Sequence, residues 1–275
     1  MEWRRNYHTH SVYCDGSNTL EEMVQEALKK DFIALGFSGH AYTAFDTSYC
    51  MDHPAFEKYC REVRALQAEH ADRLEILLGL EYDFYSEEDC SELDYRIGSV
   101  HYVYRNGKYY PVDESPEKTK QAIDAFGGDP YTYAEAYFDT VAQVTAKTGC
   151  DIIGHFDLIK KFNRNGVVLV DENHPRYIAA WKKAMKQLIP YGKPFEINTS
   201  TMAWRTDEFY PSRAILEEIH AQGGRITISG DVHQKENLNR GFRQALALAN
   251  EIGFESLTAL HAEGAVEIPI RGITE

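Results

Sequence analysis

Amphipathic stretches alternate with short apolar runs along the whole sequence. The clearest amphipathic stretch begins at Thr19-Leu20-Glu21-Glu22, which is typical of a capping box at a helix start. Apolar residues then return at helical spacing, at Leu20, Met23, Val24, Ala27 and Leu28. Similar patterns predict helices near residues 54–69, 133–148, 175–188, 211–222 and 242–252. Short apolar or β-branched runs predict strands at 32–37, 75–80, 96–103, 151–154, 195–198, 225–229 and 256–260.

This alternation of strand and helix favours an α/β fold with a parallel sheet. About seven repeats occur without a linker rich in proline, glycine or serine, so we expect residues 1–275 to form one domain, built as a closed or nearly closed barrel of the TIM type. Residues 104–131 interrupt the pattern, and Asn106-Gly107 within them is typical of a tight hairpin. This excursion is either a lid or specificity loop or a plain surface insertion.

Composition narrows the class of protein. The net charge of −14 argues against a broad basic face for nucleic acid, and it means that an anionic substrate must be held by local cations. No apolar run approaches the roughly 20 residues of a membrane span, and the first residues do not resemble a secretory signal. The five cysteines form no CxxC pair, which suits a reducing compartment. We therefore expect a cytoplasmic protein with no membrane partner.

Metal-ligand residues stand at the ends of the predicted strands. His8 and His10 are two residues apart on an extended run, so both side chains fall on one face. In a parallel barrel the carboxyl ends of the strands meet at one mouth, where active sites are built. The other strand-end residues of this kind are His40, Glu81, His101, His155, Asp231 and His233. We interpret the remaining histidines as ordinary core or rim residues: His53, His70, His174, His220 and His261.

This set of residues predicts a cluster of divalent ions. Glu81 follows the apolar run Leu77-Leu78-Gly79-Leu80, and burying its carboxylate without a partner would cost several kcal/mol. Imidazole and carboxylate ligands suit zinc, manganese or iron, and their number suits two or three ions. Cys14 lies between His10 and Asp15 and could be a soft ligand, but we interpret it as a small buried thiol. Such ions polarise phosphoryl oxygens and lower the pKa of a bridging water, which favours phosphoester hydrolysis by a bridging hydroxide.

Basic residues beyond two strand ends are candidates for binding the phosphate. Lys160, Lys161 and Arg164 follow His155, and Arg205 follows the run that starts at Glu196. Most lysines and arginines on such loops are simply solvated, and this is the alternative for each of them taken alone. Arg205 is the preferred candidate, because a guanidinium grips two phosphate oxygens at once.

The motifs resemble those of the PHP (polymerase and histidinol phosphatase) superfamily of metal-dependent phosphoesterases, over nearly the whole chain. Phe195-Glu196-Ile197-Asn198 and Tyr210-Pro211-Ser212 are similar to its histidinol-phosphatase branch. The resemblance implies a distorted (β/α)7 barrel with three metal ions at the carboxyl ends of the strands. The implied ligands are His8, His10, Glu81 and Asp231 for the first ion, Glu81, His101 and His155 for the second, and Asp15, His40 and His233 for the third.

The resemblance also implies the reaction, which is hydrolysis of L-histidinol phosphate in histidine biosynthesis. Glu81 would bridge two ions, Arg205 would neutralise charge that develops on the phosphate, and Asp231 or a metal-bound water could protonate the leaving alcohol. The amine and imidazole of the substrate call for an acidic or aromatic pocket, for which the candidates are Tyr42, Asp83, Tyr102 and the 104–131 excursion. Two alternatives stay open: a phosphoesterase acting on nucleotides or another small phosphate ester, and a metal-binding module without catalysis, such as a polymerase accessory domain.

Overall fold

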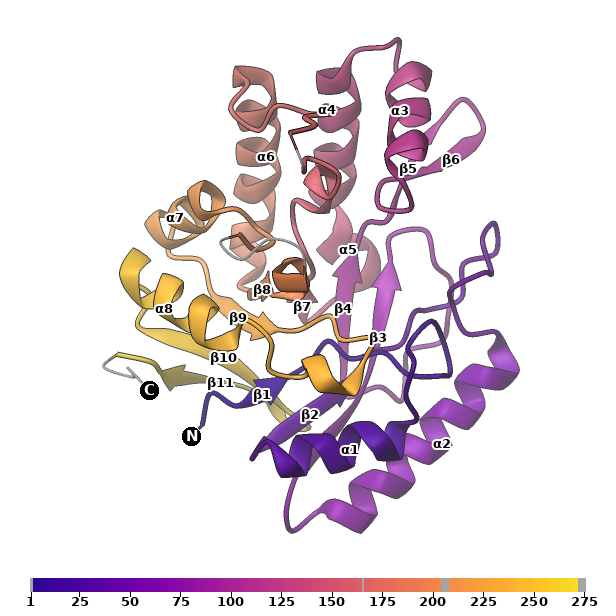
Figure 1. Ribbon diagram of the computed structural model, residues 1–275, viewed down its shortest axis with the longest axis vertical. Helices are drawn as coiled ribbons and strands as arrows, with labels where there is room; N and C mark the ends of the chain where they lie inside the picture. Colours follow the sequence, from indigo (N-terminus) through magenta and orange to yellow (C-terminus); the bar gives the residue numbers. More distant parts are fainter. Residues whose placement is uncertain (1, 165, 204–207, 272–275) are drawn as a thin grey trace.

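Seven parallel strands form the central sheet of the protein (Figure 1). The computed structural model describes residues 2–164, 166–203 and 208–271. In sheet order the strands are β1 (Arg5–Asn6), β2 (Ala34–Phe37), β3 (Glu75–Asp83), β4 (Tyr95–Ser99), β7 (Ile152–Ile153), β8 (Phe195–Asn198) and β9 (Ile226–Ser229). All six pairings between these neighbours are parallel, as the alternating pattern predicts.

The first and last strands of this sheet meet just beyond their carboxyl ends. Thr9 and Val232 form a parallel bridge. The backbone N–H of His10 donates to the carbonyl of Val232 over 2.9 Å, and the N–H of Val232 donates to the carbonyl of His8 over 3.0 Å. The sheet is thus nearly closed into a barrel, and the predicted α/β barrel is confirmed.

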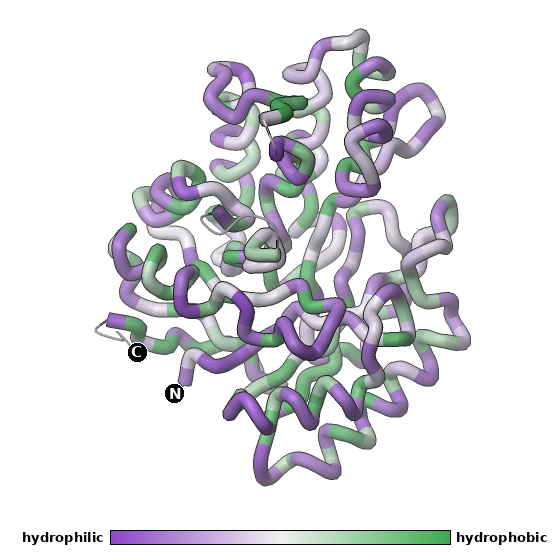
Figure 2. The backbone as a smooth tube through the Cα atoms, viewed as in Figure 1, coloured by the Kyte–Doolittle hydropathy of each residue, from purple (hydrophilic) through white to green (hydrophobic). Residues whose placement is uncertain are grey.

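The helices cover the outer face of the sheet (Figure 1). They are α1 (Leu20–Lys29), α2 (His53–His70), α3 (Pro116–Ala125), α4 (Pro130–Val141), α5 (Val144–Thr148), α6 (Pro175–Leu188), α7 (Arg213–Ala221) and α8 (Phe242–Ile252). The capping box of α1 forms as predicted, with Thr19 and Glu22 each accepting from the other's backbone N–H. Hydrophilic and hydrophobic residues alternate along α1 and α2 (Figure 2), as expected for helices with one face on the sheet and one in water.

The barrel has an interior core of its own. It consists of Tyr7, Ala34, Leu77, Tyr95, Ile97, Ile152 and Leu260, separate from the larger core under the helices. The Tyr95 ring lies against two glycines: a Cβ on Gly79 would come within 2.2 Å of a ring carbon, and a Cβ on Gly36 within 2.4 Å of the hydroxyl. That hydroxyl donates to the carbonyls of Tyr7 and Phe37. The two glycines therefore make room for the Tyr95 ring inside the barrel.

The last predicted strand lies outside the parallel sheet. β10 (Ser256–His261) pairs antiparallel with β11 (Gly264–Pro269), a strand that the sequence pattern did not predict. The Tyr7 hydroxyl donates to the carbonyl of Leu260 over 3.2 Å and accepts from its N–H over 3.0 Å. This hairpin thus packs against the amino-terminal side of the barrel interior, on the side away from the strand ends that carry the candidate ligands.

Two predicted elements are divided. The run 96–103 forms β4 and, after a break at residues 100–101, β5 (Tyr102–Arg105), which pairs with β6 (Lys108–Pro111) in the predicted Asn106-Gly107 hairpin. The break has a physical cause: the backbone N–H of His101 donates to the side chain of Asp83, at the end of β3, and not to a backbone carbonyl of that strand. The predicted helix 133–148 is likewise divided into α4 and α5, and the 104–131 excursion contains α3, which was not predicted. None of the described helices is both long and apolar enough to cross a membrane.

Candidate metal centre

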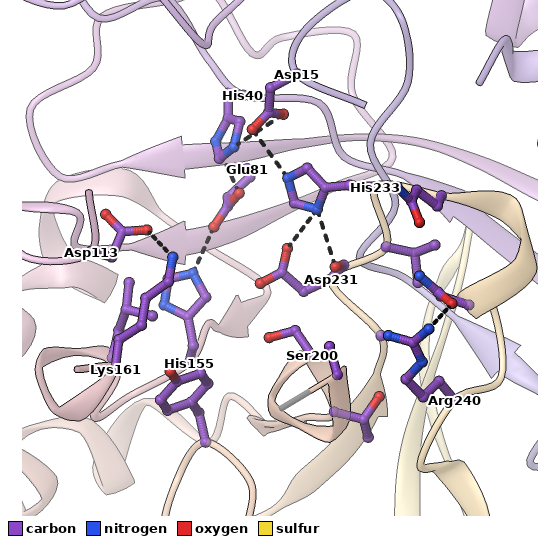
Figure 3. A pocket seen from close by; sticks show the side chains of 18 of the residues that line it. Asp15, His40, Glu81, Asp113, His155, Lys161, Ser200, Asp231, His233 and Arg240 are labelled. Atoms are coloured by element: carbon purple, nitrogen blue, oxygen red, sulfur yellow. Dashed lines mark hydrogen bonds and ion pairs between the residues drawn. The ribbon is translucent and has the colours of Figure 1, made fainter. Parts of the chain in front are cut away.

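The structure brings the nine predicted ligand residues together at the carboxyl ends of the strands. Seven of them line one pocket (Figure 3): Asp15, His40, Glu81, His101, His155, Asp231 and His233. His8 and His10 do not line it but contact Glu81 and Asp231. His8 and His10 follow β1, His40 follows β2, and Glu81 lies on β3 itself. His101 follows β4, His155 follows β7, and Asp231 and His233 follow β9. The separate strand ends therefore converge as the parallel barrel predicts.

Glu81 lies at the centre of this group and is 1% exposed. Its Oε2 is 3.1 Å from His8 Nε2, 3.0 Å from His40 Nδ1 and 3.5 Å from His10 Nε2. Its Oε1 is 2.9 Å from His155 Nε2 and 3.3 Å from His101 Nε2. One carboxylate thus faces imidazoles from several strands with both of its oxygens, which is the arrangement of a bridging ligand.

Asp15 organises a second group nearer the solvent. Its Oδ2 is 3.1 Å from His233 Nε2, and its Oδ1 is 3.6 Å from His40 Nε2 and 3.5 Å from His10 Nδ1. The rings of His10 and His233 are stacked with centroids 4.1 Å apart. His40 therefore lies between the two groups, with one ring nitrogen toward Glu81 and the other toward Asp15.

Asp231, which follows β9, approaches the two N-terminal histidines. Its Oδ1 is 3.3 Å from His10 Nε2 and 3.7 Å from His8 Nε2. Its backbone has φ +48°, a left-handed conformation that non-glycine residues seldom adopt and that is often found at functional sites. Strain here is consistent with a carboxylate held in place for a ligand.

Three atoms at the centre indicate a cation. His8 Nε2, His10 Nε2 and Glu81 Oε2 are buried and have no hydrogen-bond partner among the described residues. Ligand atoms of these three residues lie within 4.8 Å of one another, and so do those of His40, Glu81 and His101 and those of His10, Asp15, His40 and His233. Buried polar atoms without partners are costly, and one ion between them would satisfy all three. The residues present therefore fit a divalent metal.

The electrostatics point the same way. Burial acts to raise the pKa of Glu81, but the imidazoles of His8, His40 and His101 hold it well below its usual range. Burial acts to lower the pKa of His101, but Glu81 and Asp83 raise it to about 10. The pKa values of His8 and His40 are raised too, by the nearby carboxylates acting against burial. The pocket therefore attracts positive charge, which a proton or a metal ion can supply.

Glu196 on β8 is a buried carboxylate that lies behind the predicted ligands. Its Oε1 is 2.6 Å from His8 Nδ1, and its Oε2 accepts from the backbone N–H of His155 over 2.8 Å. Burial acts to raise the pKa of Glu196, but the His8 imidazole holds it below the usual range. In the sequence, Glu196 belongs to a family motif and begins the run before Arg205, but no spacing rule indicates its contact with His8.

Of the predicted substrate-binding residues that the structure describes, Lys161 lines the pocket, whereas Lys160, Arg164 and Tyr42 do not. Lys161 lines the pocket, a cavity of about 360 Å³, where its Nζ is 3.0 Å from Asp113 Oδ2 (Figure 3). Asp113 belongs to the 104–131 excursion and was not singled out from the sequence. Arg240 and Ser200 also line the pocket and were missed, because no sequence motif marks either of them; Ser200 begins the 3-10 helix Ser200–Ala203, and Arg240 lies between the 3-10 helix Lys235–Asn237 and α8.

Lys160 does not line the pocket and is 2% exposed. Its ammonium is 2.9 Å from both Asp157 Oδ2 and Glu208 Oε1, and it donates to the carbonyl of Phe209. We therefore correct the expectation for Lys160: its charge is used in an internal ion-pair network and not at the phosphate.

Arg164 and Tyr42 also lie away from the pocket lining. The backbone of Arg164 forms an antiparallel β-bridge with Val167, and its guanidinium lies 5.4 Å from the ring centroid of Phe162. The ring centroids of Tyr42 and His53 are 4.8 Å apart. Neither side chain lines the pocket, so the structure gives no support to these two expectations. Arg205 lies outside the described residues.

Three other residues considered in the sequence analysis lie near the site: Asp83 and Tyr102, candidates for the substrate pocket, and Cys14, a possible soft ligand. Asp83 accepts from the backbone of His101, and the Tyr102 hydroxyl donates to Asp46 over 2.8 Å. The thiol of Cys14 is 3.6 Å from His10 Nδ1, beside the metal-ligand groups. None of the three side chains lines the pocket.

Comparison with known proteins gives consistent results. The sequence family described as "PHP domain" matches residues 6–200. A "Probable histidinol-phosphatase" of Schizosaccharomyces pombe is 28% identical, over 91% of this chain and 87% of the relative. A "Histidinol-phosphatase" of Bacillus subtilis is 30% identical, over 88% and 98% respectively.

A solved structure shares the fold. The histidinol phosphate phosphatase of Lactococcus lactis, crystallised with zinc, L-histidinol and phosphate, superposes with a TM-score of 0.71 at 19% identity. The match covers 96% of this chain and 99% of that protein.

Proposed function

The chain belongs to the PHP domain family, and we propose that it is a metal-dependent phosphatase that hydrolyses L-histidinol phosphate to L-histidinol and phosphate. The observation that carries this proposal is the convergence of imidazoles and carboxylates on the buried Glu81, where three ligand atoms have no hydrogen-bond partner in the described part of the chain. The choice of substrate rests on the histidinol-phosphatase relatives in Schizosaccharomyces pombe and Bacillus subtilis, which the chain matches over most of their lengths.

We propose that two or three divalent ions, of zinc, manganese or iron, occupy the centre. Such ions, when bound, polarise phosphoryl oxygens and activate water. The close approach of His8, His10 and Glu81 supports the first set of ligands that the family resemblance implies, and the group around Asp15 supports the third. His40 is the exception, because its Nδ1 faces Glu81 and its Nε2 faces Asp15, so it could serve either site.

Lys161 and Asp113 are suited to binding the two charged ends of the substrate. The Lys161 ammonium faces the pocket and can bind phosphate oxygens, and the Asp113 carboxylate beside it can accept from an amine or imidazolium. A substrate that carries both groups could replace the Lys161–Asp113 pair with two new pairs. The sequence-based assignment of Arg205 to the phosphate stands beside this as part of the proposal.

Asp231 is better suited to binding a cation than to protonating the alcohol. Burial acts to raise its pKa, but the imidazoles of His8, His10 and His233 hold it well below the usual range. An ionised carboxylate accepts protons and does not supply them, so the protonation role expected for Asp231 is dropped.

A phosphate-release panel tests the substrate. We expect the metal-loaded protein to hydrolyse L-histidinol phosphate with a kcat/KM well above that for a nucleoside monophosphate or an aryl phosphate. Equal or better turnover of the other esters would support the broader phosphoesterase alternative. Release from none of them would leave only a metal-binding module.

Substitution of Asp113 tests the proposed recognition of the amine and imidazole end. Asp113→Asn should lower kcat/KM for L-histidinol phosphate by about tenfold, because a hydrogen bond to a charged group contributes about 1.5–3 kcal/mol. An aryl phosphate without a cationic group is the matched control, and its turnover should change little. An equal loss for both esters would remove Asp113 from substrate recognition.

A further inference from the structure

We propose that Glu196 is a positioning residue for the metal centre: it holds His8 in the tautomer whose Nε2 is free to bind a metal ion. This inference rests on the proposed function, since it concerns the same site. Glu196 lies on β8, is fully buried and does not line the pocket, so it acts through its neighbours and not on the substrate.

Both oxygens of Glu196 are engaged by groups from neighbouring strands. Oε1 contacts His8 Nδ1 at 2.6 Å and accepts from the Ser229 hydroxyl at 2.9 Å. Oε2 accepts from the His155 backbone N–H at 2.8 Å and from Asn198 Nδ2 at 3.0 Å. The carboxylate therefore links residues at the ends of β1, β7, β8 and β9, which adjoin one another or close the barrel.

The contact with His8 selects a tautomer. A carboxylate can only accept, so His8 Nδ1 must carry the proton and donate to Glu196. The neutral ring then has its lone pair on Nε2, the atom 3.1 Å from Glu81 Oε2 that lacks a hydrogen-bond partner. A carboxylate behind a histidine ligand is a recurring device in metal sites, where it fixes ring orientation and raises ligand basicity.

A second connection reaches Asp231 through Asn198. Asn198 Nδ2 donates to Glu196 Oε2 and also to Asp231 Oδ2, over 3.2 Å. Its Oδ1 accepts from both the N–H and the hydroxyl of Ser200, so the amide orientation is determined on both sides. Glu196 thus influences three proposed ligands: the ring of His8, the backbone of His155 and, through Asn198, the carboxylate of Asp231.

The substitution Glu196→Gln removes this function with little change in shape. If the Gln amide NH₂ faces His155 N–H and Asn198 Nδ2, donors meet donors. If the amide is turned around, its NH₂ faces His8 Nδ1 and favours the tautomer protonated on Nε2, which cannot bind a metal ion. Neither orientation of the amide reproduces the contacts of the carboxylate.

Zinc affinity, measured by competition with a chelator, tests the proposal. We expect Glu196→Gln to weaken zinc binding by about 10- to 100-fold, the usual effect of losing such a partner. Ser229→Ala is the matched control, since it removes one hydrogen bond to the same oxygen and leaves the carboxylate, and it should stay within about threefold. Binding by Glu196→Gln as tight as that of the unsubstituted protein overturns the proposal.

The ¹⁵N spectrum of His8 in the unsubstituted, zinc-loaded protein gives a second readout, which decides the matter if Glu196→Gln does not fold. The proposal predicts a proton on Nδ1 and zinc on Nε2, and the reverse arrangement overturns it. Failure of the proposed function looks different, because the unsubstituted protein would then bind no zinc or release no phosphate. If the unsubstituted protein binds zinc and releases phosphate, and only the Glu196 results disagree, the positioning role alone is lost.

Discussion

The Glu81 carboxylate lies close to five imidazoles, and the residue is almost fully buried. An ionised carboxylate in such a place requires positive charge close by, because its desolvation is otherwise uncompensated. The Ser99 hydroxyl donates to Oε1 over 2.7 Å but leaves Oε2 without a hydrogen bond. At the residue scale, Glu81 is therefore the side chain on which metal binding most depends.

Glu81→Gln should lose metal and activity together, because the amide carries no charge and offers only one acceptor atom. Elemental analysis of the purified variant is the measurement. Glu75→Gln, on the same strand but paired with Arg5 and His261, serves as the control and should keep its metal. A Glu81→Gln protein with normal metal content would contradict the bridging role.

Eight of the nine proposed ligands could be predicted because each stands at or near the end of a predicted strand, whereas Asp15 was indicated only by the family resemblance. Glu196 could not be predicted in this way, since its contacts are with residues distant in the sequence, such as His8. Lys160 and Lys161 are adjacent and equivalent in the sequence, yet one ammonium is buried in an ion-pair network and the other faces the pocket. Which of two neighbouring lysines faces a site depends on the local turn, here the 3-10 turn Leu158–Lys160.

At the element scale, the predicted strands and helices are largely correct, and the two differences below arise from contacts with residues outside the element itself. The predicted strand 96–103 ends at Ser99 because Asp83 accepts the next available N–H, that of His101. β10 leaves the parallel sheet because β11 offers an antiparallel partner along its whole length. Neither contact can be predicted from local periodicity.

The packing of Tyr95 against β3 gives a prediction at this scale. Gly79→Ala should lower the free energy of unfolding by about 1–3 kcal/mol, because its methyl group overlaps the Tyr95 ring. Urea denaturation measures the change. In a Tyr95→Leu background the same substitution should cost less, since most of the ring is gone. An equal cost in both backgrounds would show that the ring is not the obstacle.

At the scale of the whole molecule, the barrel brings the two ends of the sequence into one site, since His8 and Asp231 meet where the sheet closes. The same closure concentrates histidines and carboxylates with mutually shifted pKa values. Without metal, the neighbouring carboxylates raise the pKa values of His8, His40 and His101, which favours the protonated imidazoles. Metal ions must displace these protons to bind.

The stability of the metal-free protein should therefore depend on pH. A histidine with a raised pKa stabilises the fold fully below its unfolded value near 6.5, and this stabilisation is lost as pH rises through the folded value, about 10 for His101. The melting temperature of chelator-treated protein should thus fall between about pH 6.5 and pH 10. With zinc bound, the imidazoles are neutral ligands and the fall should disappear. A constant or rising melting temperature without metal would contradict this account.

The central claim is that divalent ions held by the strand-end residues hydrolyse L-histidinol phosphate. Zinc titration of chelator-treated protein, with phosphate release from L-histidinol phosphate followed at each step, tests it most directly. The account predicts almost no release without metal, and a rise that saturates at two or three zinc ions for each chain. Full activity in the metal-free protein, or zinc binding without any phosphate release, would contradict it.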